Sequence, residues 1–193
     1  VIVRSAVKLP EIILDKAFKN SDCKLRGIAR AGVGVDNIDL PTATKYGVAV
    51  MNSASASTIT TAEHAFALLI SLARNISNSN AVFRDGGWDR ANFVGVQLAG
   101  RTLGVIGMGR IGQAIARRAL AFGMEVLGFD PFMKESTALD GHVQMMNSFN
   151  DLITQVDMVT FHVPRTEETM SMLGKEQFAI CKNDLLVVNA ARG

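Results

Sequence analysis

Short apolar segments alternate along the chain with longer segments in which apolar residues recur every three or four positions. The first pattern is typical of strands buried on both faces of a parallel sheet, and the second is typical of helices. Their repeated alternation predicts an α/β fold with a doubly wound parallel sheet. The expected strands cover residues 1–3, 25–29, 48–51, 102–106, 125–129, 143–145, 158–162 and 185–189, and the expected helices cover residues 10–18, 40–46, 60–76, 110–122, 147–154 and 175–180.

A small polar segment at residues 52–58, with the sequence NSASAST, separates two parts of this pattern. Its composition is typical of a loop, and we interpret it as a hinge region between one domain at residues 1–51 and another at residues 52–193. The chain opens inside one expected strand and ends directly after another. We therefore expect it to be an internal piece of a longer protein.

A glycine-rich turn follows the strand expected at residues 102–106 and leads directly into a helix. In such a turn Gly107 would permit the bend, Gly109 would let the backbone approach a pyrophosphate, and Gly112 would let the helix pack on the strand. The free N–H groups and the positive dipole end of the helix would then face the phosphates. The segment predicts a dinucleotide-binding domain of the Rossmann type.

An acidic residue, Asp130, ends the next expected strand, with seventeen residues between it and Gly112. This is the spacing of a carboxylate that accepts hydrogen bonds from the ribose hydroxyls. A carboxylate would repel the 2′-phosphate of NADP, and the next residue is Pro131 rather than an arginine that could bind that phosphate. The sequence therefore predicts NAD, and not NADP, as the cofactor.

Two further segments, His162-Val163-Pro164 and Ala190-Ala191-Arg192, also follow expected strands. Ligands of open α/β sheets bind at the carboxyl ends of the strands. We therefore expect both segments to converge with Gly107 and Asp130 on one crevice.

The helix expected at residues 60–76 has almost no polar face, and Thr60 and Glu63 have the spacing of a capping box. We expect it to be buried on several sides, either as the central helix of a monomer or against a second subunit. Trp88, Phe93 and Val94 lie in the irregular segment 84–97, which suggests an arm that packs against another surface. Helix and arm together predict a homodimer with two-fold symmetry.

Composition limits the classes of partner. The net charge of +2, from 20 basic and 18 acidic residues, gives no reason to expect nucleic acid or a membrane surface as a partner. We recognise neither a signal peptide nor a membrane span. Cys23 and Cys181 lack the spacing of a metal motif, so we expect no metal site and a reduced, cytoplasmic environment.

With these segments assembled, the whole chain resembles the D-2-hydroxyacid dehydrogenases, and within that family most closely the branch that acts on 3-phosphoglycerate. The resemblance implies hydride transfer between NAD and the C2 carbon of a small anionic D-2-hydroxy acid. It also implies a flavodoxin-like α/β substrate domain, here only in part, beside the Rossmann domain. The matching segments are VRS from Val3, RAGVGVDNIDL from Arg30, TAEHAFALLISLAR from Thr61, DGGWDR from Asp85, LAGRTLGVIGMGRIG from Leu98, FDP from Phe129, FHVP from Phe161 and VVNAARG from Val187.

The resemblance also implies roles for single residues. Arg192 would be catalytic, because its planar, permanently charged group can bind the carboxylate and polarise the oxygen at C2, while its high pKa makes it a poor base. The substrate would be faced by Arg4, Ser5 and Gly32, and Arg90 of the arm would reach the substrate site of the partner. The residues that would line the cofactor are Val33, Gly107, Gly109, Arg110, Ile111, Gly112, Asp130, Pro131, Val163, Pro164, Thr169, Ala190, Ala191 and Arg192.

The chain departs from the family pattern in two places. The hinge loop has Ser53-Ala54-Ser55 where the family usually has a proline after Asn52. The family's catalytic glutamate and histidine lie beyond the last residue, and the three histidines do not replace them. We expect His64 to be packed, His142 to be solvated and His162 to shape the cofactor site. Residues 1–193 alone should therefore bind NAD without significant turnover.

Three functions stay open from the sequence. The first is oxidation of D-3-phosphoglycerate to 3-phosphohydroxypyruvate in serine biosynthesis. The second keeps the chemistry but takes another small acid of the glyoxylate or hydroxypyruvate type, which fold and cofactor motif cannot separate from the first. The third is an NAD-sensing binding protein similar to the corepressors that resemble this family.

Overall fold

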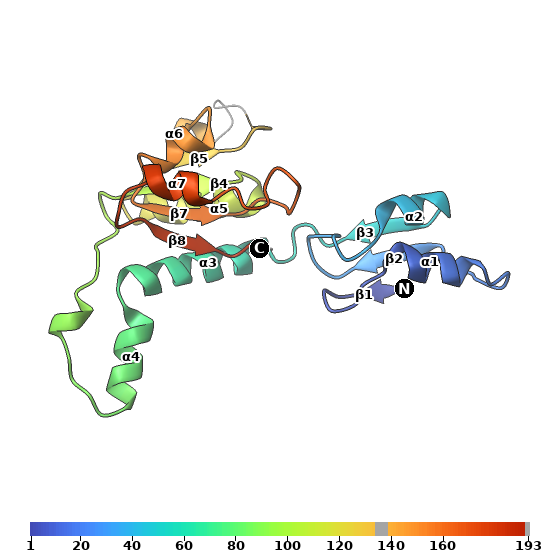
Figure 1. Cartoon of the computed structure of the whole chain (residues 1–193), viewed down its shortest axis with the longest axis horizontal. Coiled ribbons are helices and arrows are strands. Elements are labelled where there is room, and N and C mark those ends of the chain that lie inside the picture. The colour runs from blue at the N-terminus through green and yellow to red at the C-terminus, as the bar shows by residue number, and fades with distance from the viewer. Residues whose placement is uncertain (134–138, 192–193) are drawn as a thin grey trace. The chain divides into compact units, whose positions relative to one another are not determined.

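The computed structural model describes residues 1–133 and 139–191 and confirms the α/β class. The chain forms two compact units, Val1–Thr58 and Ile59–Gly193, which are described separately (Figure 1). The division falls after Thr58, at the end of the polar loop. None of the helices in the described part of the chain is both long and apolar enough to cross a membrane.

The first unit is a parallel sheet in the order β1-β2-β3. Val3, Leu14 and Ile28 are buried in its core. Asp39 caps α2, since its Oδ1 accepts a hydrogen bond of 2.8 Å from Thr42 N–H. The elements are β1 (Ile2–Val3), α1 (Glu11–Phe18), β2 (Gly27–Arg30), α2 (Leu40–Lys45) and β3 (Ala49–Asn52).

The boundaries of β2 differ from the expected strand at residues 25–29. Pairing with β3 begins at Gly27 opposite Ala49 and continues to Arg30 opposite Asn52. Arg30 is therefore the last residue of β2 and does not lie in the loop that follows the strand. This shift places its side chain at 5% exposure.

The second unit is a parallel five-stranded sheet in the order β6-β5-β4-β7-β8. Helices α3 and α5 share a core with Leu103 and Val105, and α6 shares a second core with Ile106 and Val159, so both faces are covered (Figure 1). This arrangement confirms the doubly wound Rossmann fold. The elements are α3 (Thr58–Ala73), α4 (Ile76–Arg84), η1 (Ala91–Phe93), β4 (Thr102–Ile106), α5 (Arg110–Ala121), β5 (Glu125–Phe129), η3 (Leu139–Gly141), β6 (Gln144–Met145), α6 (Phe149–Ile153), β7 (Met158–Phe161), α7 (Lys175–Ile180) and β8 (Leu186–Asn189).

The predicted bounds of the long apolar helix, residues 60–76, are wrong at both ends. Helix α3 begins at Thr58, so Thr60 lies inside it, and it ends at Ala73 because Asn75 adopts a left-handed conformation with φ of 52°. A separate helix, α4, then begins at Ile76.

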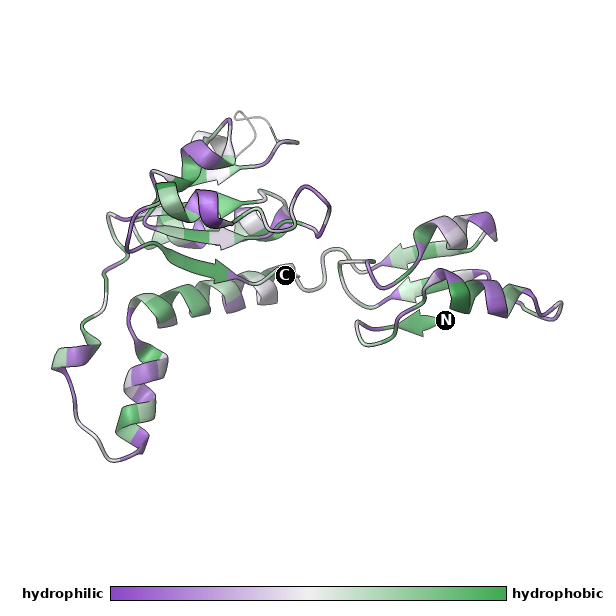
Figure 2. Cartoon of the chain, viewed as in Figure 1, coloured by the Kyte–Doolittle hydropathy of each residue, from purple (hydrophilic) through white to green (hydrophobic). Residues whose placement is uncertain are grey.

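Helix α3 is also not buried on several sides within one chain. Its buried face includes Phe66 and Leu69, whereas Leu68 and Leu72 are 40% and 45% exposed. His64, which we expected to be packed, is exposed as well. Apolar residues cover most of the length of α3 in Figure 2, and part of this apolar surface is exposed in the described part of the chain.

An arm made of residues 74–95 projects from the end of α3 (Figure 1). A hydrogen bond of 2.7 Å from Val96 N–H to the Ala73 carbonyl closes its base. Trp88 is 76% exposed and meets only the edge of Phe83 among the described rings, at a centroid distance of 6.2 Å. The arm therefore presents aromatic side chains on its surface.

A cluster of charged side chains around Asp157 connects three segments at the amino edge of the larger sheet. Asp157 accepts hydrogen bonds of 2.8 Å from Thr102 N–H and 2.8 Å from Lys182 Nζ, and Arg101 lies 3.7 Å away. Partial burial acts to raise the pKa of Asp157, but the hydrogen bonds from Lys182 and Thr102 and the nearby positive charges outweigh it, so this pKa is lowered.

We expect Asp157→Asn to lower the free energy of unfolding by about 1–3 kcal/mol at neutral pH, because it removes a charged acceptor of two hydrogen bonds. A carboxyl with a lowered pKa in the folded state stabilises that state fully above its ordinary pKa of 3.8, and the contribution is lost as the pH falls through the lowered value. The difference between wild type and variant should therefore shrink below pH ~3.8. Denaturant unfolding at several pH values measures this, with the exposed Asp184→Asn as control; a pH-independent difference would contradict it.

Candidate cofactor site

The sheet register brings the predicted site segments to one edge. Ile106, the last residue of β4, pairs with Phe129 on one side and with Phe161 on the other. Phe161 in turn pairs with Asn189. The residues that follow these strand ends therefore lie side by side at the carboxyl edge of the sheet. They are Gly107, Asp130, His162 and Ala190.

The glycine turn has the geometry that its sequence predicts. Gly107 has a φ of +89°, and a Cβ there would lie 2.8 Å from the backbone of His162. A Cβ on Gly112 would overlap the carbonyl oxygen of Gly107, so only glycine lets α5 pack this closely against the turn. Gly109 differs, because a Cβ there would meet no atom within 4 Å. Gly109 thus borders open space large enough for another group to approach the backbone.

The start of α5 suits an anion. Its N-cap is Gly109, which supplies no side-chain cap, and its first turn has no acidic residue. The free N–H groups and the positive end of the helix dipole are therefore not neutralised by the helix's own first turn. Arg110 is exposed and Ile111 is half-buried at this end. A pyrophosphate fits these donors and the open space beside Gly109.

Asp130 is held by two backbone groups. Its Oδ2 accepts a hydrogen bond of 2.9 Å from Met108 N–H, and its Oδ1 accepts one of 2.9 Å from Phe132 N–H. Each carboxylate oxygen keeps a second lone pair that can accept from a ribose hydroxyl. Pro131 is exposed beside it. The anchored carboxylate therefore fits the ribose-binding role.

His162 is neutral at neutral pH. Burial lowers its pKa from 6.5 to about 4, and its Nε2 lies 2.9 Å from Thr160 Oγ1. An imidazole with so low a pKa is a poor proton acceptor near pH 7, and this agrees with the role in shaping the site. His142, expected to be solvated, is exposed.

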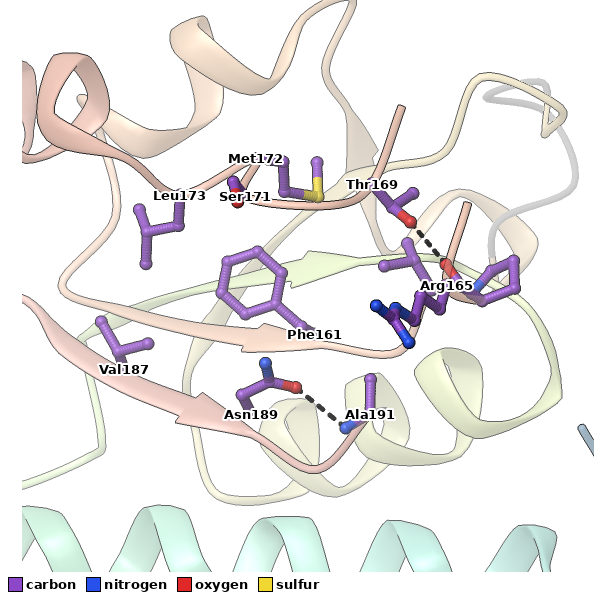
Figure 3. A pocket seen from close by; sticks show the side chains of 11 residues that line it. Phe161, Arg165, Thr169, Ser171, Met172, Leu173, Val187, Asn189 and Ala191 are labelled. Carbon is purple, nitrogen blue, oxygen red and sulfur yellow. Dashed lines mark hydrogen bonds between the residues drawn. The ribbon is translucent and has the colours of Figure 1, made fainter. Parts of the chain in front are cut away.

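A pocket of about 220 Å³ lies between the ends of β7 and β8 and the loop that follows β7 (Figure 3). Phe161, Leu173 and Val187 form its apolar part, and Arg165 and Asn189 also line it. Four of the residues predicted to line the cofactor are among its lining residues, namely Val163, Pro164, Thr169 and Ala191.

Hydrogen bonds fix the backbone around this pocket. Thr169 Oγ1 donates to the Pro164 carbonyl at 2.6 Å (Figure 3) and accepts from Thr166 N–H at 2.8 Å. Asn189 Oδ1 accepts from Ala191 N–H at 2.9 Å. Ala190 is partly buried against the core that contains α5. Arg192, the predicted catalytic residue, lies outside the described residues.

In the first unit, the predicted substrate residues Ser5 and Gly32 meet around Arg30. Arg30 Nη2 donates to Ser5 Oγ at 2.7 Å and Nη1 donates to the Ala31 carbonyl at 2.9 Å. A Cβ on Gly32 would overlap Arg30 Nη1. The buried Nε has no hydrogen-bond partner among the described residues.

Arg30 is a candidate substrate-binding residue that was not among the residues predicted from the sequence. The sequence does indicate it, because a charged residue is rarely found at the carboxyl end of a buried strand. The expected strand ended at residue 29, and that boundary concealed the signal.

The remaining predicted residues belong to both units. Arg4 is exposed, and its carbonyl accepts a hydrogen bond of 3.3 Å from Asn37 Nδ2. The Val33 carbonyl accepts one of 2.7 Å from Asn52 Nδ2 at the start of the hinge loop. Arg90 lies in the arm, in the second unit.

Comparison with known proteins agrees with this geometry. Residues 66–193 match the family model described as D-isomer specific 2-hydroxyacid dehydrogenase, NAD binding domain. The chain belongs to this family. Because the matching model is that of an NAD-binding domain, the prediction of NAD as cofactor is confirmed.

Individual relatives match over the whole chain. It is 44% identical over 192 residues to a D-3-phosphoglycerate dehydrogenase of Methanocaldococcus jannaschii, covering 100% of this chain and 36% of that protein. It is also 44% identical to a D-3-phosphoglycerate dehydrogenase of Bacillus subtilis, covering 100% of this chain and 35% of that protein. The chain thus spans about a third of the length of these relatives. A D-lactate dehydrogenase from Aquifex aeolicus, solved with NAD and lactic acid, is 32% identical with a TM-score of 0.88, covering 100% of this chain and 56% of that one.

Proposed function

We propose that the full-length protein is an NAD-dependent dehydrogenase that oxidises D-3-phosphoglycerate to 3-phosphohydroxypyruvate, in serine biosynthesis. The observation that carries the dehydrogenase chemistry is the meeting of the glycine turn, the uncapped start of α5 and the anchored Asp130 at one sheet edge. The relatives named for phosphoglycerate support the choice of substrate.

Each predicted site residue has a separate task in the proposed reaction. Bound NAD would supply the hydride acceptor. The start of α5 would hold its pyrophosphate and Asp130 would orient a ribose. Ala190 and Ala191, with their small side chains, would leave room for the nicotinamide ring. Arg192 would hold the substrate carboxylate and polarise the C2 oxygen.

The charge of Arg30 supports an anionic substrate. An arginine at 5% exposure needs partners for its charge, yet among the described residues its side chain donates only to neutral oxygens and its Nε has no partner. A phosphate or carboxylate beside Ser5 and Gly32 would supply the missing negative charge. We assign the exposed Arg4 to the same anion, and the exposed Arg90 to the anion in the substrate site of the partner subunit. In this proposal the first unit is part of a flavodoxin-like substrate domain.

A substrate panel tests the proposal. The full-length protein should reduce NAD with D-3-phosphoglycerate at a kcat/KM well above that with D-lactate, D-glycerate or glycolate. A preference for glyoxylate or hydroxypyruvate in the reverse direction would support the dehydrogenase chemistry but refute D-3-phosphoglycerate as the substrate. Tight NAD binding without turnover on any acid would favour the corepressor-like alternative.

We propose that the protein works as a homodimer built on α3 and the arm. The exposed apolar side chains support this, among them Leu68, Leu72 and Trp88. A cytoplasmic location is part of the same proposal, and the unpaired Cys23 and Cys181 are compatible with it.

The double variant Leu68→Glu and Leu72→Glu should convert the dimer into a monomer, because it places charge in the middle of the apolar contact. Sedimentation equilibrium at micromolar concentration measures this. Ile180→Glu, at an exposed apolar position on α7, is the matched control and should remain dimeric. A wild-type protein that is already monomeric would refute the interface.

A further inference from the structure

The peptide unit that joins Met108 to Gly109 stands at the centre of the glycine turn. Met108 N–H donates to Asp130 Oδ2 at 2.9 Å. The Met108 carbonyl accepts a hydrogen bond of 3.1 Å from Gln113 Nε2. The side chain of Asp130, directly after β5, therefore holds the nitrogen of Met108, and the side chain of Gln113 in α5 holds its oxygen.

The carbonyl of Met108 depends on Gln113 because helix α5 does not reach it. The first backbone bond of α5 runs from Gln113 N–H to the Gly109 carbonyl at 3.0 Å, one residue after Met108. The Gln113 side chain extends the same pattern by one position. A half-buried glutamine in the first turn of α5 thus replaces a helical hydrogen bond that the backbone cannot make.

The orientation of this carbonyl decides what the turn presents to an anion. In a planar trans peptide the C=O and the following N–H point in opposite directions. With the Met108 oxygen turned toward Gln113, the Gly109 N–H points away from that side chain. Among the described residues nothing accepts a hydrogen bond from this N–H, and a Cβ on Gly109 would meet no atom within 4 Å.

We propose that Gln113 is a positioning residue for the cofactor pyrophosphate. By holding the Met108 carbonyl it keeps a partial negative charge away from the phosphates and leaves the Gly109 N–H free to donate to them. A turn released from Gln113 could rotate this peptide, and the carbonyl oxygen would then repel the anion. The inference rests on the NAD binding of the proposed function and adds a determinant of affinity outside the glycine pattern.

The test uses the full-length protein with Gln113→Met, which keeps the length of the side chain and removes the donor. Isothermal titration should show the Kd for NAD and for ADP-ribose raised about three- to tenfold, the effect of one lost hydrogen bond. Adenosine, which lacks phosphate, should bind as it does to wild type. The kcat at saturating NAD should stay unchanged. Gln113→Glu, which cannot donate at neutral pH, should weaken NAD binding as well.

The matched control is Gln155→Met, because Gln155 Nε2 donates to the Asp151 carbonyl at 2.9 Å at the end of α6, away from the glycine turn. Its NAD affinity should equal that of wild type. An unchanged Kd for NAD in Gln113→Met, or an equal loss of affinity for adenosine, would overturn the positioning role. Failure of the wild type itself to bind NAD would instead refute the proposed function.

Discussion

Replacing Arg192 by alanine in the full-length protein should lower kcat/KM by about 10²–10³ while the affinity for NAD changes by no more than a few-fold. Arginine suits the substrate carboxylate and the oxygen at C2 because its planar group donates to both and stays charged at any working pH. The interaction with the C2 oxygen strengthens as charge develops there, so its loss affects the transition state more than the bound cofactor.

Steady-state kinetics with the preferred acid, together with titration of NAD, separate these two effects. Arg117→Ala is the control, because Arg117 is an exposed arginine of α5 that is not among the predicted site residues. It should retain kcat within a few-fold. A near-normal kcat/KM in Arg192→Ala would show that another residue binds the carboxylate.

The sequence predicts the elements best where local signals and tertiary packing agree. The strands β4 and β5 and the helix α7 have the expected bounds, because apolar runs there are bounded by glycine, charged or polar residues. Asp39 and Gly47 act at the ends of α2 as their residue types suggest, with Gly47 at a φ of +65°. The turn at Gly107 is equally local, since the bend requires glycine whatever packs around it.

Properties that depend on distant contacts could not be predicted in this way. The residues around Asn75 continue the helical pattern of the sequence, yet the backbone turns there. The side-chain Nδ2 of Asn75 donates to the Val94 carbonyl at 3.3 Å, a contact with the end of the arm. The apolarity of Leu68 and Leu72 predicts burial, but hydropathy does not say whether the same chain or another one covers them.

The site shows the same division. Spacing along the chain predicts Asp130 and the three glycines, because their roles follow from their distance to one strand. Arg30 depends on the register of β2 against β3, and a boundary error of one residue hides it. Gln113 depends on a side-chain conformation that reaches back to Met108, and a glutamine in a first helical turn carries no signal of that contact.

Replacing Gly112 or Gly109 of the turn by alanine should have different effects on stability and on NAD affinity. In Gly112→Ala the new Cβ would overlap the Gly107 carbonyl, so α5 must move away from the turn. We expect a loss of about 1–3 kcal/mol in the free energy of unfolding, as in other overpacked sites. NAD affinity should fall as well, because the donors at the start of α5 move with the helix.

In Gly109→Ala the fold should remain, because the backbone φ of −65° suits alanine and no atom of the chain lies within 4 Å of the new Cβ. The methyl group would instead occupy the space proposed for the pyrophosphate, so the Kd for NAD should rise at least about tenfold at unchanged stability. Calorimetric unfolding and NAD titration on both variants, with Gly174→Ala at the start of α7 as control, measure the two quantities separately. If Gly109→Ala bound NAD as wild type does, the phosphates would not lie in the open space beside Gly109. The pyrophosphate would then have to contact the turn at one of its other glycines.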